Sequence, residues 1–412
     1  MKSDLDALLA ANGLDAMLVT GSGQHNPAMV YLTGGGHFSE ADLIKKRGEE
    51  AVLFHASMER EEAAHTGLQT RSFSNYPWVE LMRAAGGDRA RALAIRYQRM
   101  FEDMGLTSGK VVLYGHADVG LVYSVFEQLH QLMPDLTLVG DANDRILLEA
   151  MSTKDAAEVE RIRKVGRITT EVVGQVADFL SGHAVKDGVL VRPDGEPLTI
   201  GRVKRQIDLW LAERGAENPE GTIFSIGRDA AIPHNSGTPT DLLRLGQTIV
   251  FDIYPCEAGG GYFHDFTRTW SLGYATDEVL QIYEQVLSVY RQILSELEVG
   301  RPCADYQRRT CELFEAMGHP TVLSNAETET GYVHSLGHGV GMQIHERPWF
   351  SLFRAASENV LKPGVVVAVE PGLYYPERGI GVRLENTVWV DPQGRMDILA
   401  DYPLDLVLPV KG

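Results

Sequence analysis

The chain has 412 residues, and its 38 Lys and Arg residues against 56 Asp and Glu residues give a net charge of −18. Such an acidic surface repels phosphate backbones and anionic membranes, so we expect neither nucleic acid nor a membrane as a partner. Asp4 and Asp6 stand where a signal peptide needs apolar residues, and no apolar run is long enough to span a bilayer. The three cysteines form no C-x-x-C pair. Together these features predict a cytoplasmic protein.

Residues 1–150 are predicted to form a small α/β domain. Leucines at three- and four-residue steps indicate a helix near the start, and apolar, β-branched segments bounded by turn residues indicate strands at 15–20, 49–55 and 109–115. The Arg- and Ala-rich stretch between the last two strands is predicted to be helical. The glycines at 34–36 lack the spacing of a phosphate-binding loop, which indicates an ordinary loop.

A boundary between two domains is predicted near 148–153. Ser152 and Asp155 match a capping box for a helix that reaches about Leu180, because Val and Ile recur within it at three- and four-residue steps. After Gly182, two D-G pairs predict an inserted hairpin at about 183–200. A helical pattern resumes at about 202–214.

The segment from 247 onward is predicted to form strands that carry acidic residues inside apolar runs, with helices at about 277–298 and 303–317 between them. Asp252 lies in TIVFDIY, Asp265 in FHDFTRT, Glu370 in VVVAVEPG and Glu385 in VRLENTV. An ionised carboxylate in a buried strand needs a cationic partner or a metal, because its desolvation costs several kcal/mol.

Two explanations of these four carboxylates are open. Each carboxylate could form a buried ion pair, with Arg268 or Arg383 as its partner. Two arginines, however, balance only half of the negative charge, whereas two divalent cations balance all of it. His338, in GHGVG, would offer such cations a neutral imidazole nitrogen. Carboxylates with one imidazole favour manganese, with cobalt, zinc or iron as alternatives, and the metals would serve hydrolysis.

Five sequence pieces follow one another in the order AAIPHNS, FDIY followed by HDFTRT, SLGHGVGMQIHE, VEPGLY and VRLENT. In this order they resemble the pita-bread metallopeptidases, the family of methionine aminopeptidase, prolidase, Xaa-Pro aminopeptidase and creatinase. The resemblance implies a two-domain α+β protein with a pita-bread catalytic domain at 151–412. GLDAMLV, YLTGG and STKDAAEVERIRK resemble, over less of the chain, the smaller α/β creatinase-like N-terminal domain of proline-specific members, here 1–150.

The resemblance implies five metal ligands, and the expected residue type stands at each position. Asp252 would chelate one divalent ion, His338 and Glu370 would bind the other, and Asp265 and Glu385 would bridge the two. Creatinase and the histone-chaperone relatives keep the fold but lose ligands. The complete set therefore favours an active metallopeptidase.

The same resemblance implies three catalytic residues. His345 would stabilise the oxyanion at the scissile carbonyl, His234 would lie near the leaving nitrogen of proline, and Glu370 would shuttle a proton. His264 and His334, which flank ligand positions, are predicted to pack or to support the ligands.

The sequence departs from the family pattern at three places. Asp252 and Asp265 are further apart than usual, and the extra CEAGGG predicts a longer hairpin loop rather than a lost site. FDIY replaces the usual D-A-G or D-L-G, and the hairpin at 183–200 is an insertion. These differences concern substrate preference more than metal binding.

The expected reaction is hydrolysis of the peptide bond before a proline in second position. An Xaa-Pro dipeptidase is favoured, and an Xaa-Pro aminopeptidase acting on longer peptides is the alternative. A dipeptidase needs a cation for the substrate's carboxylate; Arg347 and Arg354 are candidates, although ordinary surface positions explain both equally well. Aromatic candidates for an apolar proline pocket, with a place in the core as the alternative, are Tyr332, Trp349, Phe350 and Tyr374.

Two functions of other classes stay open. A creatinase-like C–N hydrolase would work without metal, and a non-catalytic binding protein on the same fold would hold none. Relatives with this two-domain pattern are often homodimers, so the resemblance also implies a homodimer.

Overall fold

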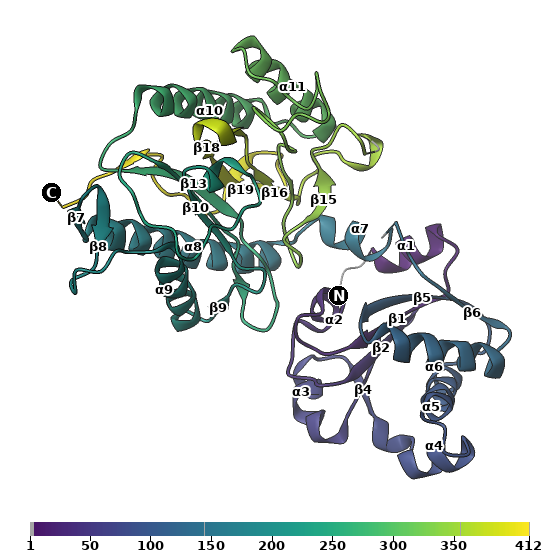
Figure 1. Ribbon diagram of the computed structural model, residues 1–412. Helices are drawn as coiled ribbons and strands as arrows, with labels where there is room; N and C mark the ends of the chain where they lie inside the picture. Colours follow the sequence, from purple (N-terminus) through teal and green to yellow (C-terminus); the bar gives the residue numbers. More distant parts are fainter. Residues whose placement is uncertain (1–3, 144, 355, 412) are drawn as a thin grey trace. The chain divides into compact units, whose positions relative to one another are not determined.

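The computed structural model describes residues 4–143, 145–354 and 356–411. Contacts divide the chain into two compact units, one of Met1–Met151 with Gly259–Gly261 and one of Ser152–Ala258 with Tyr262–Gly412 (Figure 1). Among the described residues, the helices are all too short or too polar to cross a lipid bilayer.

The first unit is built on a sheet with the strand order β4-β3-β2-β1-β5-β6, in which β2 runs antiparallel to both neighbours and the other pairs are parallel. Helices α5 and α6 pack against each other and supply much of the core beside this sheet. The elements are α1 (Leu5–Ala11), β1 (Ala16–Gly21), α2 (Pro27–Thr33), β2 (Ala41–Lys46), β3 (Val52–His55), α3 (Arg60–His65), β4 (Gln69–Ser72), α4 (Trp78–Ala84), α5 (Arg89–Asp103), β5 (Gly109–His116), α6 (Val119–Leu132), β6 (Leu136–Val139) and α7 (Leu147–Ser152).

The predicted strands at 15–20 and 109–115 are confirmed as β1 and β5, and the segment between 56 and 108 is largely helical, as predicted. The predicted strand at 49–55 is shorter, because a turn that includes Gly48 at φ 78° precedes β3. The glycines at 34–36 lie in a loop, as predicted: Gly34 ends α2 in the left-handed conformation, with φ 81°.

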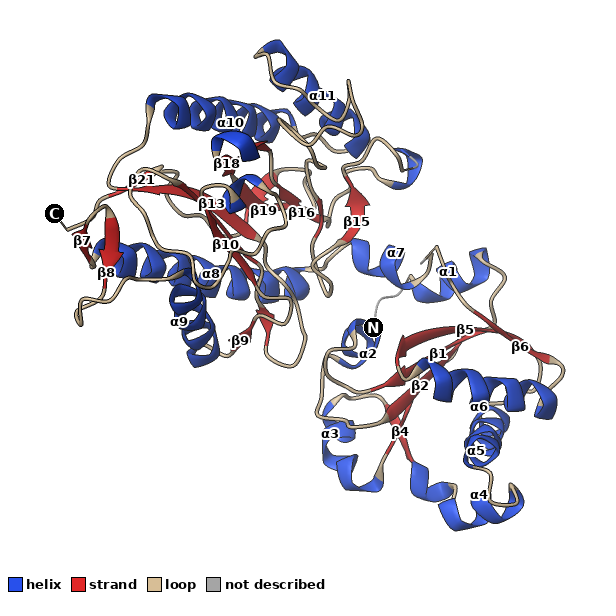
Figure 2. Ribbon diagram, viewed as in Figure 1, coloured by secondary structure: helices blue, strands red, loops and turns tan. Residues whose placement is uncertain are grey.

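The second unit contains a large, mainly antiparallel sheet whose described strands follow the order β10-β11-β13-β19-β16-β14-β15, with β20 beside β19 and β21 beside β13. Figure 2 shows α8 and α9 along one part of this sheet and α10 and α11 along another. The elements are α8 (Ala156–Ser181), β7 (Ala184–Lys186), β8 (Val189–Val191), α9 (Ile200–Glu213), β9 (Ala216–Glu217), β10 (Thr222–Ile226), β11 (Thr248–Ile253), β12 (Cys256–Glu257), β13 (Phe266–Leu272), α10 (Asp277–Glu296), α11 (Cys303–Ala316), β14 (His338–Gly339), β15 (Glu346–Trp349), β16 (Val366–Val369), β17 (Gly372–Tyr375), β18 (Ile380–Arg383), β19 (Glu385–Val390), β20 (Met396–Ile398) and β21 (Val407–Leu408).

One face of this sheet is apolar and packs on the helices. On β11, Phe251 and Ile253 join a core with α8 and α9, and on β19, Val388 and Val390 join a core with α10 and α11. Successive side chains of a strand point to opposite faces. Asp252 therefore lies on the face turned away from the helices, which is where a polar site can form.

The predicted hairpin after Gly182 is confirmed, and the capping box is corrected. β7 and β8 pair through a turn at Asp187 and Gly188, whose φ angles of 52° and 75° suit the predicted D-G turn. Helix α8 does begin with a capping box, but the pair is Asp155 and Glu158 rather than Ser152 and Asp155, because Asp155 accepts from the Glu158 backbone N–H and the Glu158 side chain accepts in return.

The long connection between Asp252 and Asp265 is more than a widened hairpin. It forms β12, which pairs with β9, and its glycines Gly259–Gly261 group with the first unit. There the backbone N–H of His25 donates to the carbonyl of Gly259 at 2.9 Å.

Candidate metal centre

The predicted metal ligands lie on adjacent strands of the large sheet. Asp252 lies in β11, Asp265 directly precedes β13, Glu385 begins β19, Glu370 directly follows β16 and His338 begins β14. These strands are consecutive in the sheet, so residues that are far apart in the sequence meet at one place. The sequence predicted Asp265 and Glu370 inside strands, but each lies one residue outside its strand. Their backbones are held there, because the Asp265 N–H donates to the Thr387 hydroxyl at 3.1 Å and the Glu370 N–H donates to the Leu336 carbonyl at 2.8 Å.

The register of the sheet aligns the carboxylates. Asp252 is paired with Thr267 on β13, and Thr267 is paired with Glu385 on β19. Residues directly opposite each other in an antiparallel pair project to the same face. The Thr267 hydroxyl donates to Glu385 Oε2 at 2.5 Å, which fixes the orientation of that carboxylate.

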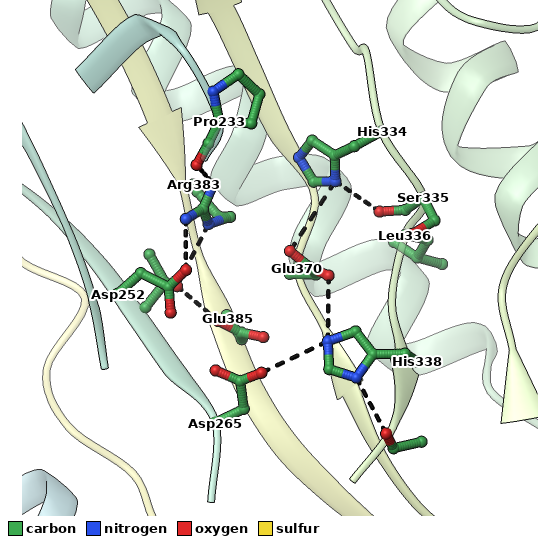
Figure 3. A network of polar contacts seen from close by, with 12 residues as sticks. Pro233, Asp252, Asp265, His334, Ser335, Leu336, His338, Glu370, Arg383 and Glu385 are labelled. Atoms are coloured by element: carbon green, nitrogen blue, oxygen red, sulfur yellow. Dashed lines mark hydrogen bonds and ion pairs between the residues drawn. The ribbon is translucent and has the colours of Figure 1, made fainter. Parts of the chain in front are cut away.

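A cavity of about 470 Å³ opens at this face of the sheet and is lined by every predicted metal-ligand and catalytic residue. The side chains of the four acids and His338 point towards one another (Figure 3). Asp265, His338 and Glu385 each place one donor atom within 4.8 Å of the other two, which is close enough for all three to bind the same metal ion. The lining residues from the sequence prediction are His234, Asp252, Asp265, His338, His345, Glu370 and Glu385.

His338 is arranged as a ligand rather than as a hydrogen-bond donor to the acids. Its Nδ1 lies 3.0 Å from the Gly339 carbonyl, so Nδ1 carries the proton and Nε2 keeps a lone pair. Nε2 lies 3.5 Å from Asp265 Oδ2 and 3.6 Å from Glu370 Oε1, too far for a hydrogen bond. Burial lowers the pKa of His338 to about 3, which keeps the ring neutral. The lone pair of His338 Nε2 therefore faces those of Asp265 Oδ2 and Glu370 Oε1, and a cation bound between these atoms would remove their repulsion.

The carboxylates repel one another unless cations are bound. Burial, followed by repulsion from Glu385 and Asp252, raises the pKa of Asp265 well above its ordinary value. Burial, Asp252 and Glu370 do the same for Glu385. Burial and Asp252 raise the pKa of Glu370 to about 8 despite the opposing effect of Arg383. Ionised side chains in such a cluster are stable only with added positive charge.

Among the described residues, Asp252 is the one acid of the cluster that forms an ion pair with an arginine. Arg383 Nη2 donates to Asp252 Oδ2 at 2.5 Å, while Arg268 turns to backbone carbonyls and to Asp401. The buried Oδ1 atoms of Asp252 and Asp265 have no hydrogen-bond partner among the described residues. Ion pairs with Arg268 and Arg383 therefore do not account for the cluster, and the unpaired oxygens fit metal ions.

Three histidines line the cavity beyond the ligand set. The ring centroid of His345 lies 4.3 Å from that of His338, and burial lowers its pKa. His234 lies three residues after the short 3-10 helix Asp229–Ala231 and lines the cavity together with Pro233. His334 binds Tyr374 Oη through Nε2 at 2.9 Å, and burial lowers its pKa to about 3.

The sequence offered Arg383 as an ion-pair partner for the carboxylates but missed its other two partners. Its guanidinium donates to Asp252 and to the Pro233 carbonyl at 3.2 Å (Figure 3). It also donates to Tyr374 Oη at 2.8 Å, so it ties three segments together. Tyr374 in turn contacts His334. The motif VRLENT contains Arg383, but only the folded structure shows which oxygen atoms accept hydrogen bonds from its guanidinium group.

The aromatic candidates separate into one cavity residue and three core residues. Trp349 lines the cavity. Tyr332 and Phe350 are fully buried in the core beside α10 and α11, and Tyr374 is fully buried with its hydroxyl in the arginine network. His264 is fully buried, and its ring nitrogens lack hydrogen-bond partners in the described structure, which fits the predicted packing role.

Comparisons with known proteins agree with this arrangement. The family model "Metallopeptidase family M24" matches residues 160–392. An Xaa-Pro dipeptidase from Pyrococcus horikoshii is 31% identical over 394 residues, which cover 93% of this chain and 92% of that protein. An Xaa-Pro dipeptidase from Pyrococcus furiosus is 32% identical over 290 residues, which cover 66% of this chain and 76% of that protein.

The solved structure of an X-Pro aminopeptidase from Thermotoga maritima is similar across both units, with a TM-score of 0.73, 22% identity and coverage of 97% of this chain and 99% of that one. The predicted family and the two-domain α+β pita-bread fold are thus confirmed. The chain belongs to metallopeptidase family M24.

Proposed function

We propose that the chain hydrolyses the peptide bond before a proline in second position, with Xaa-Pro dipeptides as its preferred substrates. The observation that carries this proposal is the single cavity that collects four carboxylates and His338 together with His234 and His345. The two Pyrococcus relatives, which are named Xaa-Pro dipeptidases, support it.

Two divalent cations are proposed to bind this donor set, with Asp252 on one ion, His338 and Glu370 on the other, and Asp265 and Glu385 shared. Manganese is favoured, because the donors are carboxylates and one imidazole, without a thiolate. When bound, such ions act as a Lewis acid that lowers the pKa of water and polarises a carbonyl.

The chain's own residues are proposed to position the substrate and to move protons. Glu370, whose side chain is 16% exposed, would accept a proton from the water that attacks the scissile carbonyl and pass it to the leaving nitrogen. His345 would donate a hydrogen bond to the oxygen of the scissile carbonyl as negative charge develops there. His234 would lie beside the proline nitrogen, which has no hydrogen of its own.

The preference for dipeptides rests on the size and the rim of the cavity. A volume of about 470 Å³ lies at the lower end of the range for small-molecule sites and suits two residues better than a long peptide. Arg354 lies over the Trp349 ring at 4.3 Å, which brings a cation next to the cavity lining. We assign Arg354 to the substrate's terminal carboxylate. Arg347 is the weaker candidate, because Glu358 lies 3.7 Å from its guanidinium.

Hydrolysis of Ala-Pro and Ala-Pro-Ala by the manganese-loaded protein tests the proposal. Ala-Pro is expected to be the better substrate by kcat/KM, and a chelator is expected to abolish both activities. A clear preference for Ala-Pro-Ala would identify an Xaa-Pro aminopeptidase instead. Activity on Ala-Pro that survives complete metal removal would contradict the metallopeptidase assignment.

Residues 1–150 are proposed to act as a creatinase-like N-terminal domain, and the protein is proposed to be a homodimer, by the resemblance to proline-specific members. The three buried, unpaired cysteines fit a cytoplasmic location. Sedimentation of the purified protein tests the homodimer directly.

A further inference from the structure

A buried ion pair lies outside the donor set described above. Lys154 Nζ donates to Glu346 Oε2 at 2.8 Å, and the two side chains are 1% and 0% exposed. Lys154 lies just before α8, while Glu346 begins β15, directly after His345. Buried pairs of this kind add little net stability, because desolvation offsets the attraction, so the pair calls for another explanation.

The Glu346 carboxylate holds the turn that carries His345. Its Oε1 accepts a hydrogen bond from the Gln343 backbone N–H at 2.9 Å. Its Oε2 fills the space beside Gly341, where an added Cβ would lie 2.4 Å from that atom. The Gly341 N–H donates to the Gln343 carbonyl at 3.1 Å and closes the turn. The Glu346 carboxylate therefore lies inside the turn formed by residues 341–346 and stabilises its conformation.

Lys154 is fixed from the opposite side. Its backbone N–H donates to the Gly364 carbonyl at 2.7 Å, and the preceding Thr153 forms a bridge with Val365. Strand β16 begins one residue later and leads to Glu370. The ion pair thus connects the segment just before β16, the strand that leads to Glu370, with the turn that contains His345.

We propose that Lys154 is a positioning residue, which acts through Glu346 to hold the His345 imidazole over the metal centre. This inference rests on the proposed function and adds to it a residue that positions His345, the proposed oxyanion-binding histidine. A displacement of about 1 Å at a reacting group is enough to reduce a rate by about a hundredfold. The chain contacts on both sides of the pair restrict such a displacement.

The test combines Lys154→Met with His345→Ala in a double-mutant cycle. K154M is expected to lower kcat on Ala-Pro by about ten- to a hundredfold, with wild-type metal content and little change in KM. In the H345A background, the same change is expected to cost less than about twofold, because residues that act as a unit are non-additive. Equal losses in both backgrounds would overturn the inference.

A readout independent of activity separates this inference from the proposed function. Amide hydrogen exchange of the peptide that covers residues 340–346 is expected to accelerate at least tenfold in K154M. Lys45→Met is the matched control, since Lys45 is a buried lysine paired with Asp6 at 2.6 Å in the first unit; it is expected to leave this peptide and kcat unchanged. Unchanged exchange at 340–346 in K154M overturns the inference whatever the activity. A wild-type protein inactive on Ala-Pro would contradict the proposed function instead.

If K154M does not fold, K154M with Glu346→Leu provides the second variant. Replacement of a buried ion pair by apolar residues of similar volume is often tolerated. This double variant is expected to fold and to bind metal but to lose kcat as K154M does. Wild-type kcat in the double variant would contradict the positioning role.

Discussion

Arg383 Nη2 donates to Asp252 Oδ2 at 2.5 Å, while the Oδ1 atom of the same carboxylate is buried without a hydrogen-bond partner among the described residues. The arginine thus fixes one oxygen and leaves the other without a hydrogen bond in the described structure. This division explains how a salt-bridged acid could also serve as a metal ligand. Among the described residues, the neighbouring acids have no arginine ion pair of this kind, so their charge remains for cations.

Replacement of Arg383 by Met is expected to lower kcat/KM on Ala-Pro by about ten- to a hundredfold, because Asp252 and Tyr374 both lose the donor that orients them. Arg383→Lys is expected to restore only part of this loss, since an ammonium lacks the fork that reaches three acceptors. Steady-state kinetics with parallel metal analysis measures the effect. Wild-type kinetics in Arg383→Met would show that the arginine is not needed to orient Asp252.

The cation-free protein is expected to lose stability as the pH rises from about 4.5 to about 8. Glu370 has its pKa raised from 4.5 to about 8 in the folded state, and the pKa values of Asp265 and Glu385 are also raised. A group with a raised folded-state pKa contributes stability below its ordinary pKa and loses that contribution as the pH passes through the raised value. Urea unfolding of chelated protein across this range measures the decline. Saturating manganese should remove most of it, and a flat profile for the chelated protein would contradict the repulsion.

Glu385→Gln is expected to stabilise the cation-free protein while it abolishes metal-dependent activity. The amide removes one negative charge from a repulsive cluster, so the cation-free melting temperature at pH 8 should rise by a few degrees. The same change removes a shared ligand, so metal content and hydrolysis should fall together. Glu296→Gln is the control, because Glu296 pairs with Arg309 on the helices away from the cavity. A lower melting temperature for cation-free Glu385→Gln would argue against electrostatic strain.

Arg354→Met is expected to raise the KM for Ala-Pro about tenfold, because a charge-assisted contact to the substrate's carboxylate is lost. Ala-Pro-Ala, whose carboxylate lies one residue further away, should be affected much less. Arg378→Met, which removes an arginine stacked on Tyr375 outside the cavity lining, is the matched control. An equal increase in KM for both peptides would show that Arg354 does not bind the terminal carboxylate of the dipeptide.

The sequence predicted the acidic residues and His338 that line the cavity better than it predicted the contacts that hold them. Asp252 and Glu385 were recognisable because a carboxylate among β-branched residues is costly and local, so a short window reveals it. The contacts of Arg383 with Tyr374 and Pro233 depend on strand order and register, which no local pattern contains. The same limit hid the pair of Lys154 and Glu346, which are 192 positions apart.

Two finer points could not be decided from the sequence: which residue caps α8, and which aromatic rings belong to the core. Asp155 caps α8 in place of Ser152, because Glu158 lies three residues after Asp155 and completes the reciprocal pair. Tyr332 and Phe350 fill the core because large aromatic rings gain most from full burial, and sequence alone does not separate such a ring from one that lines a pocket.

The dependence of hydrolysis on two bound cations is tested by titration of manganese into chelator-treated protein, followed by calorimetry and by Ala-Pro hydrolysis in the same samples. We expect binding of about two ions per chain, with activity that appears as the sites fill and with neither binding nor activity in Glu385→Gln. Full hydrolysis without bound metal, or a wild-type chain that binds no divalent cation, would contradict this dependence.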